Sequence, residues 1–484
     1  MTALLALLPC AVVIAAVLWL RRSGLVAATA ALALTLLLWL AGIFAPFDAA
    51  ALPRALADGL LLCGLVGSVI VTGLLYVEIA KRIGSLTAVT AAIQAMELDP
   101  PRAAIVIVTG VGVLLESLTG FGVSLLVTIP LLASLYDRGR TIGLGLIGMS
   151  LMPWGALSVS AILGAELAGL PVEALAAAYL WTSGPVAFVL PLACLVFVRG
   201  ATAGTFGFAG LAGACLVAGI AGTNWLIGVE VAGVGGGVAV LILAVLAAPE
   251  PGKVWRALTR PPLAFIWLLI AGVVAQKLLT PVLADAGFAP VVSTGRVAVS
   301  VMSSPGIALL TVAVAGWLLW RRPLRKAAGQ ALAPLVLMRS WRALLTIAVF
   351  LTMARLLVET GGIGALSAQL AEAGIYAAAV IVSALAGVGA YVTGSAVPAA
   401  ALFMPSAAAV GESFGQLPLF AALQHSAAGH ASMASLPIIA ILLAALPERR
   451  RQDEAASLRI GLQLAAVWLA MVVASGWLQL AFAR

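Results

Sequence analysis

Charged residues are scarce in this chain: they make up 9% of its 484 residues, whereas hydrophobic residues make up 63%. A soluble globular domain carries about 25% charged residues, so this composition excludes one. It is instead typical of a polytopic helical membrane protein, in which charges are confined to loops and functional positions.

Cysteine and histidine are too few and too dispersed to build a metal site or a disulfide framework. The four cysteines lie within apolar runs and show no ligand spacing. A membrane-embedded enzyme would need a nucleophile paired with a base, or a metal cluster. The candidate residues for such a site are only His425 and His430, and neither has a nearby Cys or Asp in the sequence. We therefore predict a protein that is not an enzyme and has no cofactor or bound metal. The remote alternative to this prediction is a membrane-embedded enzyme.

Long apolar runs predict an all-α polytopic membrane protein with about twelve transmembrane helices and two re-entrant helical hairpins. The spans are expected at about 4–20, 24–44, 59–79, 141–165, 174–198, 204–222, 230–248, 262–276, 299–320, 341–358, 415–445 and 460–482. The hairpins are expected at 103–135 and 376–411, and the spans 141–165 and 415–445 are expected to be broken helices.

The net charge of +8 needs no nucleic-acid partner, because Lys and Arg accumulate in the cytoplasmic loops of membrane proteins. Placing both termini outside puts most of the cationic residues inside. We thus predict a multi-pass protein of a bacterial-type plasma (inner) membrane. Leu4 to Leu20, followed by Arg21-Arg22, is interpreted as a first span rather than a removed signal peptide.

The first hairpin is centred on a carboxylate and a glycine-rich tip, Glu116–Gly122 (ESLTGFG). Gly120 and Gly122 each weaken a helix by about 1 kcal/mol relative to Ala. Its arms of roughly 15 residues would each rise only about 22 Å, which is short of the hydrocarbon core. Irregular backbone at that depth is tolerated where it faces protein or a water-filled cavity. The tip is therefore predicted to be half of a binding site; the alternative is an ordinary kinked span with a satisfied Glu.

A second, similar stretch, Ala390–Pro398 (AYVTGSAVP), lies inside the apolar run that follows Tyr376. Four matches in the same order, at offsets of about 274 to 280, relate this region to the first hairpin and its flanks. Duplicated halves with interrupted segments at matching places indicate a secondary transporter. The predicted organisation is 1–58, N-terminal scaffold spans; 59–198, first repeat; 199–340, linking spans and a cytoplasmic amphipathic helix; and 341–484, second repeat, inverted relative to the first.

Each hairpin is followed by a span with its own interruption, Ser150–Ser158 (SLMPWGALS) and Gln424–Ser432 (QHSAAGHAS). Pro153 kinks the first, and Gly429 is expected to soften the second. Helix N-termini exposed at such breaks bind carboxylate or phosphate through free N–H groups. The alternative is that Pro and Gly only bend these helices for packing.

Acidic residues inside spans are costly and usually functional. Glu116 and Glu230 are the deepest candidates, and a solvated role is as well supported for Glu78, Glu359 and Glu412. The two histidines can carry a proton or pack as satisfied side chains. Arg355 is expected to pair with Glu359 at i,i+4, or else to meet substrate.

At this point three motifs resemble those of the L-lactate permease family. Leu114–Gly122 (LLESLTGFG) is similar to its LLEGxxGFG segment, Gly228-Val-Glu with Gly233–Gly237 to its GPE…GG stretch, and Val392–Ser395 (VTGS) to the start of its LTGSDTSSN segment. After Ser395 the chain departs from the family, because Ala396–Ala400 (AVPAA) replaces the polar run. The family's Asn-Thr-Ser-Gly-Gly break also differs, and reads HSAAG here.

The resemblance implies proton-coupled uptake of 2-hydroxymonocarboxylates such as lactate and glycolate, and kinship with elevator-type ion transporters. The expected partners are a small organic anion and a co-transported proton or sodium ion, with the lipid bilayer around the protein and the scaffold spans as a candidate homodimer interface. A sodium-coupled carboxylate or inorganic-anion carrier of the same architecture is the alternative. The expected substrate-binding residues are Ser117, Thr119, Gly120, Phe121, Gly122, Ser150, Trp154, Thr393, Gly394, Ser395, His425, Ser426 and His430. The expected proton carriers are Glu116, His430 and Glu230, with Glu116 preferred because its position matches the family's hairpin Glu.

Overall fold

The computed structural model describes residues 2–43, 48–120, 122–321, 324, 331–448 and 450–482. Most of them are helical, which confirms the predicted fold class in its coarse form. The first half contains α1 (Thr2–Leu18), α2 (Gly24–Leu40), α3 (Ala51–Ile83), α4 (Ser85–Gln94), α5 (Pro100–Ile105), a π-helical segment (Val106–Gly112), α6 (Val113–Thr119), α7 (Leu125–Leu135), α8 (Arg138–Gly148), α9 (Val159–Ala168) and α10 (Val172–Cys194). The linking part contains α11 (Ala203–Leu226), α12 (Ala232–Ala247), α13 (Pro251–Leu258), α14 (Ala264–Asp285), β1 (Val291–Ser293), β2 (Ala298–Ser300) and α15 (Pro305–Leu319). The last part contains α17 (Leu332–Glu359), α18 (Gly362–Glu372), α19 (Ile375–Thr393), α20 (Ala396–Ser413), α21 (Leu417–Ala431), α22 (Leu436–Ala445) and α23 (Arg451–Phe482).

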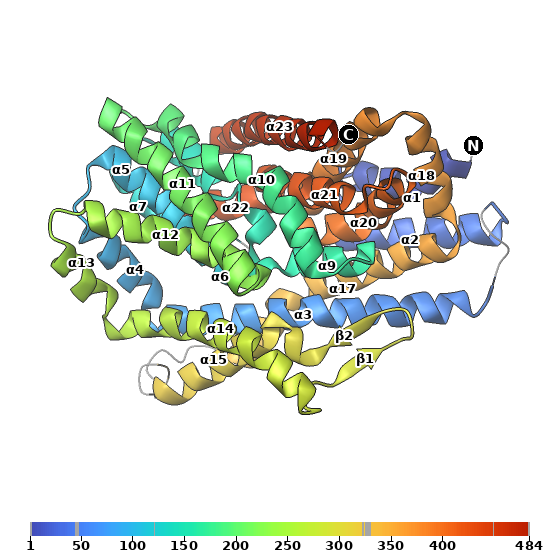
Figure 1. The fold of residues 1–484 in the computed structure, drawn as a ribbon, viewed down its shortest axis with the longest axis horizontal. Helices are drawn as coiled ribbons and strands as arrows, with labels where there is room; N and C mark the ends of the chain where they lie inside the picture. Colours follow the sequence, from blue (N-terminus) through green and yellow to red (C-terminus); the bar gives the residue numbers. More distant parts are fainter. Residues whose placement is uncertain are drawn as a thin grey trace.

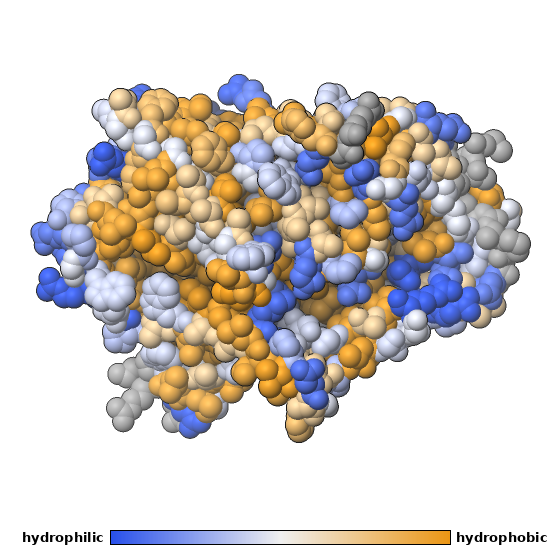
Figure 2. Space-filling view, viewed as in Figure 1, coloured by the Kyte–Doolittle hydropathy of each residue, from blue (hydrophilic) through white to orange (hydrophobic). Residues whose placement is uncertain are grey.

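Among the described residues, nine helices are long and apolar enough to cross a membrane, or ten if the bent pair α21 and α22 is one span. The apolar helices α1, α2 and α15 are shorter, at 15 to 17 residues. The protein is thus a multi-pass membrane protein, and the number of twelve spans stays a prediction. Hydrophobic residues cover large parts of the face in Figure 2, and many of the most hydrophilic residues gather towards its two ends.

Long helices of the two halves pack directly on one another. In Figure 1, α3 and α17 run side by side, with α14, α15 and the β1–β2 hairpin on one side and the remaining helices on the other. A Cβ at Gly59 of α3 would lie 2.8 Å from the backbone nitrogen of Thr352 in α17. Small residues that allow such close approach are the usual means of helix association in lipid.

The same succession of helices occurs twice along the chain. A long helix, a short helix, a helical hairpin, a broken helix and a closing helix follow each other as α3 to α10 and again as α17 to α23. The predicted division into repeats at 59–198 and 341–484 stays a prediction. Their relation as inverted repeats stays a prediction.

The two hairpins have their turns where the sequence predicted them, but the arms of the first are unequal. The first arm, Pro100–Thr119, has 20 residues, whereas α7 has 11. At 1.5 Å per residue the first arm is about 30 Å long, close to the thickness of a hydrocarbon core. The first arm is thus longer than the 15 residues expected, and whether either hairpin re-enters the membrane stays a prediction.

The predicted pair between Arg355 and Glu359 is wrong. Both the Nε and Nη2 atoms of Arg355 donate to Oδ2 of Asp58 on α3, at 3.0 and 2.8 Å, and Glu359 pairs with Arg296. Asp58 is buried beside Arg355, so a partner on the adjacent long helix replaces the neighbour one turn away. Helix packing, which the sequence spacing does not encode, decides between the two partners.

Candidate functional site

The tip of the first hairpin contains a backbone conformation at Gly120 that only glycine adopts readily. Gly120 has φ 67° and ψ −169°, a region of backbone space that is essentially closed to other residues. A Cβ at Gly120 would lie 2.5 Å from the Cβ of Ala156. The tip therefore touches the broken segment that follows α8.

The carboxylate of Glu116 is bound by its own hairpin. Its Oε1 accepts the N–H of Gly122 at 3.0 Å and its Oε2 accepts the hydroxyl of Ser124 at 2.7 Å. The side chain is buried. Both oxygens thus hold the tip in shape, and the carboxylate covers the N-terminal end of α7.

The break between α8 and α9 has an unusual backbone. Ala156, Leu157 and Ser158 all have positive φ angles, between 49° and 54°. Left-handed conformations cost non-glycine residues about 1–2 kcal/mol each, and such strain clusters at functional sites. The hydroxyl of Ser158 donates to the carbonyl of Val229 at 2.8 Å, which ties the turn to the segment before α12.

The tip of the second hairpin joins α19 to α20. Gly394 has φ 81°, and a Cβ there would lie 2.7 Å from Cγ of Pro437 in α22. Ser395 caps α20, since its hydroxyl oxygen accepts the N–H of Val397 at 3.3 Å. Thr393 bonds the carbonyl of Gly389 one turn back.

Three helix N-termini from both halves of the chain meet at one cavity of about 120 Å³. They are the starts of α9, α20 and α22, which begin at Val159, Ala396 and Leu436. The lining is Met152, Gly155, Ala156, Val159, Ser160, Gly394, Ser395, Ala396, Val397, Pro437, Ile438 and Ile441. Helix N-termini attract anions through free N–H groups and the helix dipole. The N-terminus of α7, at the tip of the first hairpin, is instead covered by Glu116.

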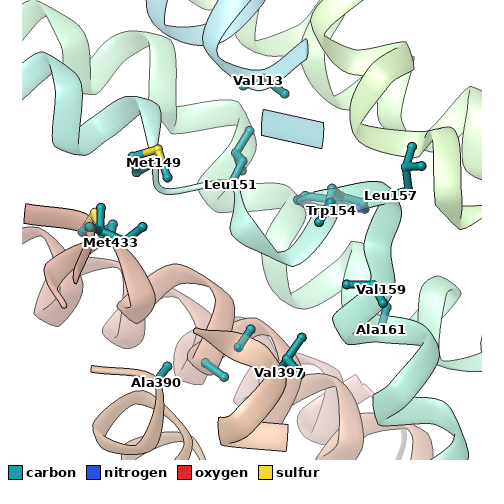
Figure 3. Close-up of a cluster of buried hydrophobic side chains, with 14 of the residues drawn as sticks. Val113, Met149, Leu151, Trp154, Leu157, Val159, Ala161, Ala390, Val397 and Met433 are labelled. Atoms are coloured by element: carbon teal, nitrogen blue, oxygen red, sulfur yellow. The ribbon is translucent and has the colours of Figure 1, made fainter. Parts of the chain in front are cut away.

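Apolar side chains surround this convergence. Figure 3 shows Val113 of α6, Trp154 and Leu157 of the broken segment, Val397 of α20 and Met433 after α21 gathered around the crossing of the two halves. Ser435, the residue before α22, is fully buried, and its hydroxyl has no hydrogen-bond partner among the described residues. The surroundings of the cavity thus combine apolar side chains with polar groups at the ends of helices.

A buried polar cluster lies behind the broken segment. Nδ1 of His430 is 2.6 Å from the carbonyl of Ser150, and its Nε2 is 3.0 Å from the hydroxyl of Ser183. Ser426 bonds both Ser183 and Thr182, at 2.8 and 2.6 Å. Because a carbonyl can only accept, Nδ1 of His430 carries a hydrogen. The hydroxyl of Ser183 donates to Ser426, so these side chains connect α10 and α21 through buried hydrogen bonds.

His425 and three aromatic side chains complete this cluster. Nε2 of His425 is 3.1 Å from the carbonyl of Pro153, and its ring packs 4.6 Å from the ring of Tyr179. The ring of Trp154 also packs on Tyr179, at 5.2 Å. The indole N–H of Trp468 donates to Ser150 at 3.0 Å. All these side chains are buried, so they fix the shape of the broken segment from behind.

The expected site residues therefore separate into distinct places. Gly394 and Ser395 line the cavity, Gly120 touches its wall, and Ser150, Trp154, His425, Ser426 and His430 form the cluster behind it. Ser117 and Thr119 are not among the lining residues of the cavity: the side chain of Ser117 lies beside Gly233 of α12, and the hydroxyl of Thr119 donates to the carbonyl of Leu115. Phe121 lies outside the described residues.

The predicted interruption at Gly429 is wrong in position. Helix α21 continues through His430 to Ala431, and the bend of 43° follows at the break before Leu436. A Cβ at Gly429 would lie 2.5 Å from Cγ of Pro153. Gly429 thus serves close packing against the first break, whereas Pro437 marks the start of the second half-helix.

Glu230 lies apart from the other expected proton carriers. It sits in a short turn before α12, and its Oε1 accepts from Nζ of Lys277 at 2.9 Å. Sequence reasoning missed Lys277, and also Thr182, Ser183 and Trp468. The adjacent hydroxyls of Thr182 and Ser183 inside an apolar span were the available signal for the polar cluster, while Lys277 stood at the end of a predicted span.

Comparison with known proteins gives one family match. A family model described as L-lactate permease matches residues 248–474, which confirms the resemblance over that part of the chain. The matched range includes the second hairpin and His425 to His430, but not the first hairpin. No curated protein matches the chain.

Proposed function

We propose that this protein is a secondary active transporter that takes up 2-hydroxymonocarboxylates such as L-lactate and glycolate together with protons. The match to the L-lactate permease family over residues 248–474 supports a lactate transporter rather than an enzyme. The meeting of three helix N-termini at one cavity carries the anion part of the proposal. A cavity of about 120 Å³ holds roughly four water volumes, which suits a small organic acid.

In this proposal, the carboxylate binds at the helix starts beside Ala396 and Val159, with the hydroxyls of Ser160 and Ser395 as further donors. No buried lysine is needed there, because the backbone supplies the positive potential. The two hairpins and two broken helices form a moving transport domain, and the half-exposed helices around them form the scaffold. Movement of that domain across the membrane would be of the elevator type.

Proton coupling offsets the charge of the substrate. A monocarboxylate entering against a negative interior costs about 2.3 kcal/mol per 100 mV, and one proton cancels that charge. Of the three candidate carriers, Glu116 has both oxygens engaged by its hairpin, and His430 has both nitrogens engaged. Glu230 keeps one oxygen without a partner among the described residues. This geometry favours Glu230 over the sequence-based preference for Glu116.

The test is uptake by proteoliposomes that contain the purified full chain. Radiolabelled L-lactate, glycolate and succinate are offered under an imposed pH gradient, an imposed sodium gradient, or neither. Accumulation of L-lactate and glycolate that follows the pH gradient supports the proposal. Accumulation that follows sodium alone supports the alternative, a sodium-coupled carrier, and the absence of uptake of every substrate overturns the transporter assignment.

A further inference from the structure

A second cavity, of about 210 Å³, lies between α14 and the turn that carries Glu230. Its lining includes Glu173, Glu230, Gln276, Lys277, Thr280 and Ser303. In contrast to the first cavity, it contains a full positive charge, the ammonium group of Lys277. It adjoins the first site through the turn before α12, since Val229 accepts the hydroxyl of Ser158.

The ion pair in this cavity is asymmetric. Glu230 has a side chain only 9% exposed, whereas that of Lys277 is 30% exposed. One oxygen of Glu230 binds Lys277, and the other is buried without a partner among the described residues. A Cβ at Gly228 would lie 2.7 Å from both Oε2 of Glu230 and Cε of Lys277. The side chains of Glu230 and Lys277 thus pack directly against the backbone of Gly228, which has φ 148°.

The amide of Gln276 is already occupied. Its Nε2 donates to the carbonyls of Met302 and Ser304, at 2.6 and 2.7 Å, and its Oε1 accepts the N–H of Ala308 at 3.1 Å. Lys277 is consequently the group in this cavity that is able to bind an anion. Thr280 and Ser303 also line the cavity, and the hydroxyl of Thr280 donates to the carbonyl of Gln276 at 2.8 Å, so its oxygen is left to accept from a hydroxyl on that anion.

We propose that this cavity is a second anion site, in which Lys277 binds a small monocarboxylate while Glu230 takes up a proton. This inference rests on the proposed function, which it extends by naming residues for coupling. In the empty site, the carboxylate of Glu230 neutralises Lys277. When a proton adds to Glu230, its carboxyl becomes neutral, and the carboxylate of the substrate takes its place beside the ammonium group.

This exchange conserves the charge of the site. One anion and one proton enter, so the sum of charges on Lys277, Glu230 and the ligand is zero before and after. Removing one partner of a buried ion pair without replacement is strongly destabilising. Anion binding and protonation are therefore linked, and neither is favourable alone.

The charges around Glu230 agree with a preference for monocarboxylates. Glu173 at the rim lies 4.0 Å from Nζ of Lys277, and the buried side chain of Tyr179 interacts electrostatically with Glu230. A second carboxylate on the ligand would meet Glu173 and be repelled. The volume of about 210 Å³ corresponds to roughly seven water volumes, enough for a short acid and its hydroxyl.

The test measures equilibrium binding of radiolabelled L-lactate to the purified full chain at about pH 6 and about pH 8, where the ligand stays ionised. For the wild type, one linked proton weakens binding at this site by up to about tenfold per pH unit. Glu230→Gln leaves the charge of Lys277 free, so its affinity should rise at the higher pH and vary less than about twofold between the two. The double variant Lys277→Gln with Glu230→Gln, which leaves no buried charge unpaired, should lose this binding event entirely. Glu173→Gln should gain binding of succinate.

The matched control is the double variant Lys253→Gln with Glu97→Gln, which removes a more exposed Lys–Glu ion pair between α13 and the loop after α4. Its L-lactate binding should equal that of the wild type. If Glu230→Gln keeps the pH dependence of the wild type, or if the Lys277 double variant binds L-lactate unchanged, the second site does not exist. If the wild type nevertheless accumulates L-lactate in proteoliposomes, either result overturns the second site and leaves the proposed transport function in place. A wild type that neither binds nor transports monocarboxylates would instead overturn the proposed function.

Discussion

Replacing Gly120 by alanine should destabilise the hairpin tip through backbone strain and through a steric contact with Ala156. The backbone at φ 67° and ψ −169° is one that alanine adopts only with strain of about 1–3 kcal/mol. The new Cβ would also lie 2.5 Å from that of Ala156, and overpacking costs about 1–3 kcal/mol. Since Ala156 belongs to a turn that is itself left-handed, it has little freedom to move. We expect Gly120→Ala to destabilise the folded chain by about 2–6 kcal/mol in total.

The assay is thermal unfolding of the purified chain together with initial uptake of L-lactate in proteoliposomes. The matched control is Gly210→Ala in α11, where a Cβ would meet open space and where alanine favours the helix by up to about 1 kcal/mol. Gly120→Ala should unfold several degrees lower and lose most uptake, whereas Gly210→Ala should unfold at or above the wild-type temperature. Equal unfolding temperatures and uptake rates for Gly120→Ala and the wild type would refute the assigned backbone and the contact with Ala156.

Three further outcomes are expected. Gly429→Ala should lower stability by about 1–3 kcal/mol, measured by thermal unfolding, because its Cβ would meet Pro153 at 2.5 Å; an unchanged melting temperature would contradict the close packing of the two breaks. Glu116→Gln loses one charged acceptor of the tip, which lowers stability by about 1–3 kcal/mol, yet it should keep pH-driven uptake if Glu230 carries the proton. Loss of pH-driven accumulation with preserved exchange would return that role to Glu116. In a cysteine-free background, a Cys at Arg140 should be labelled only from the cytoplasm and one at Glu412 only from outside; labelling of both from one side would exclude the inverted topology.

The sequence determined the features that depend on composition and local chemistry. A chain with 63% hydrophobic residues can satisfy its backbone in a bilayer mainly as helices, so the fold class followed directly. The turns at Gly120 and Gly394 were also predictable, because glycine-rich breaks in apolar runs weaken a helix wherever it lies. The break at Pro153 was predictable for a similar reason, because proline interrupts the helix in which it lies.

Tertiary structure decided which residues meet. Gly429 and Gly120 are both glycines in apolar stretches, yet Gly429 stays helical because α21 needs close contact with Pro153. Arg355 had an acidic neighbour one turn away and nevertheless bonds Asp58 on another helix. Glu116 and Glu230 were equivalent as buried carboxylates in sequence. In the folded chain Glu116 bonds groups of its own hairpin, whereas Glu230 pairs with Lys277. Lys277 is far from Glu230 in sequence, so helix packing and the need to pair a buried charge determine this contact.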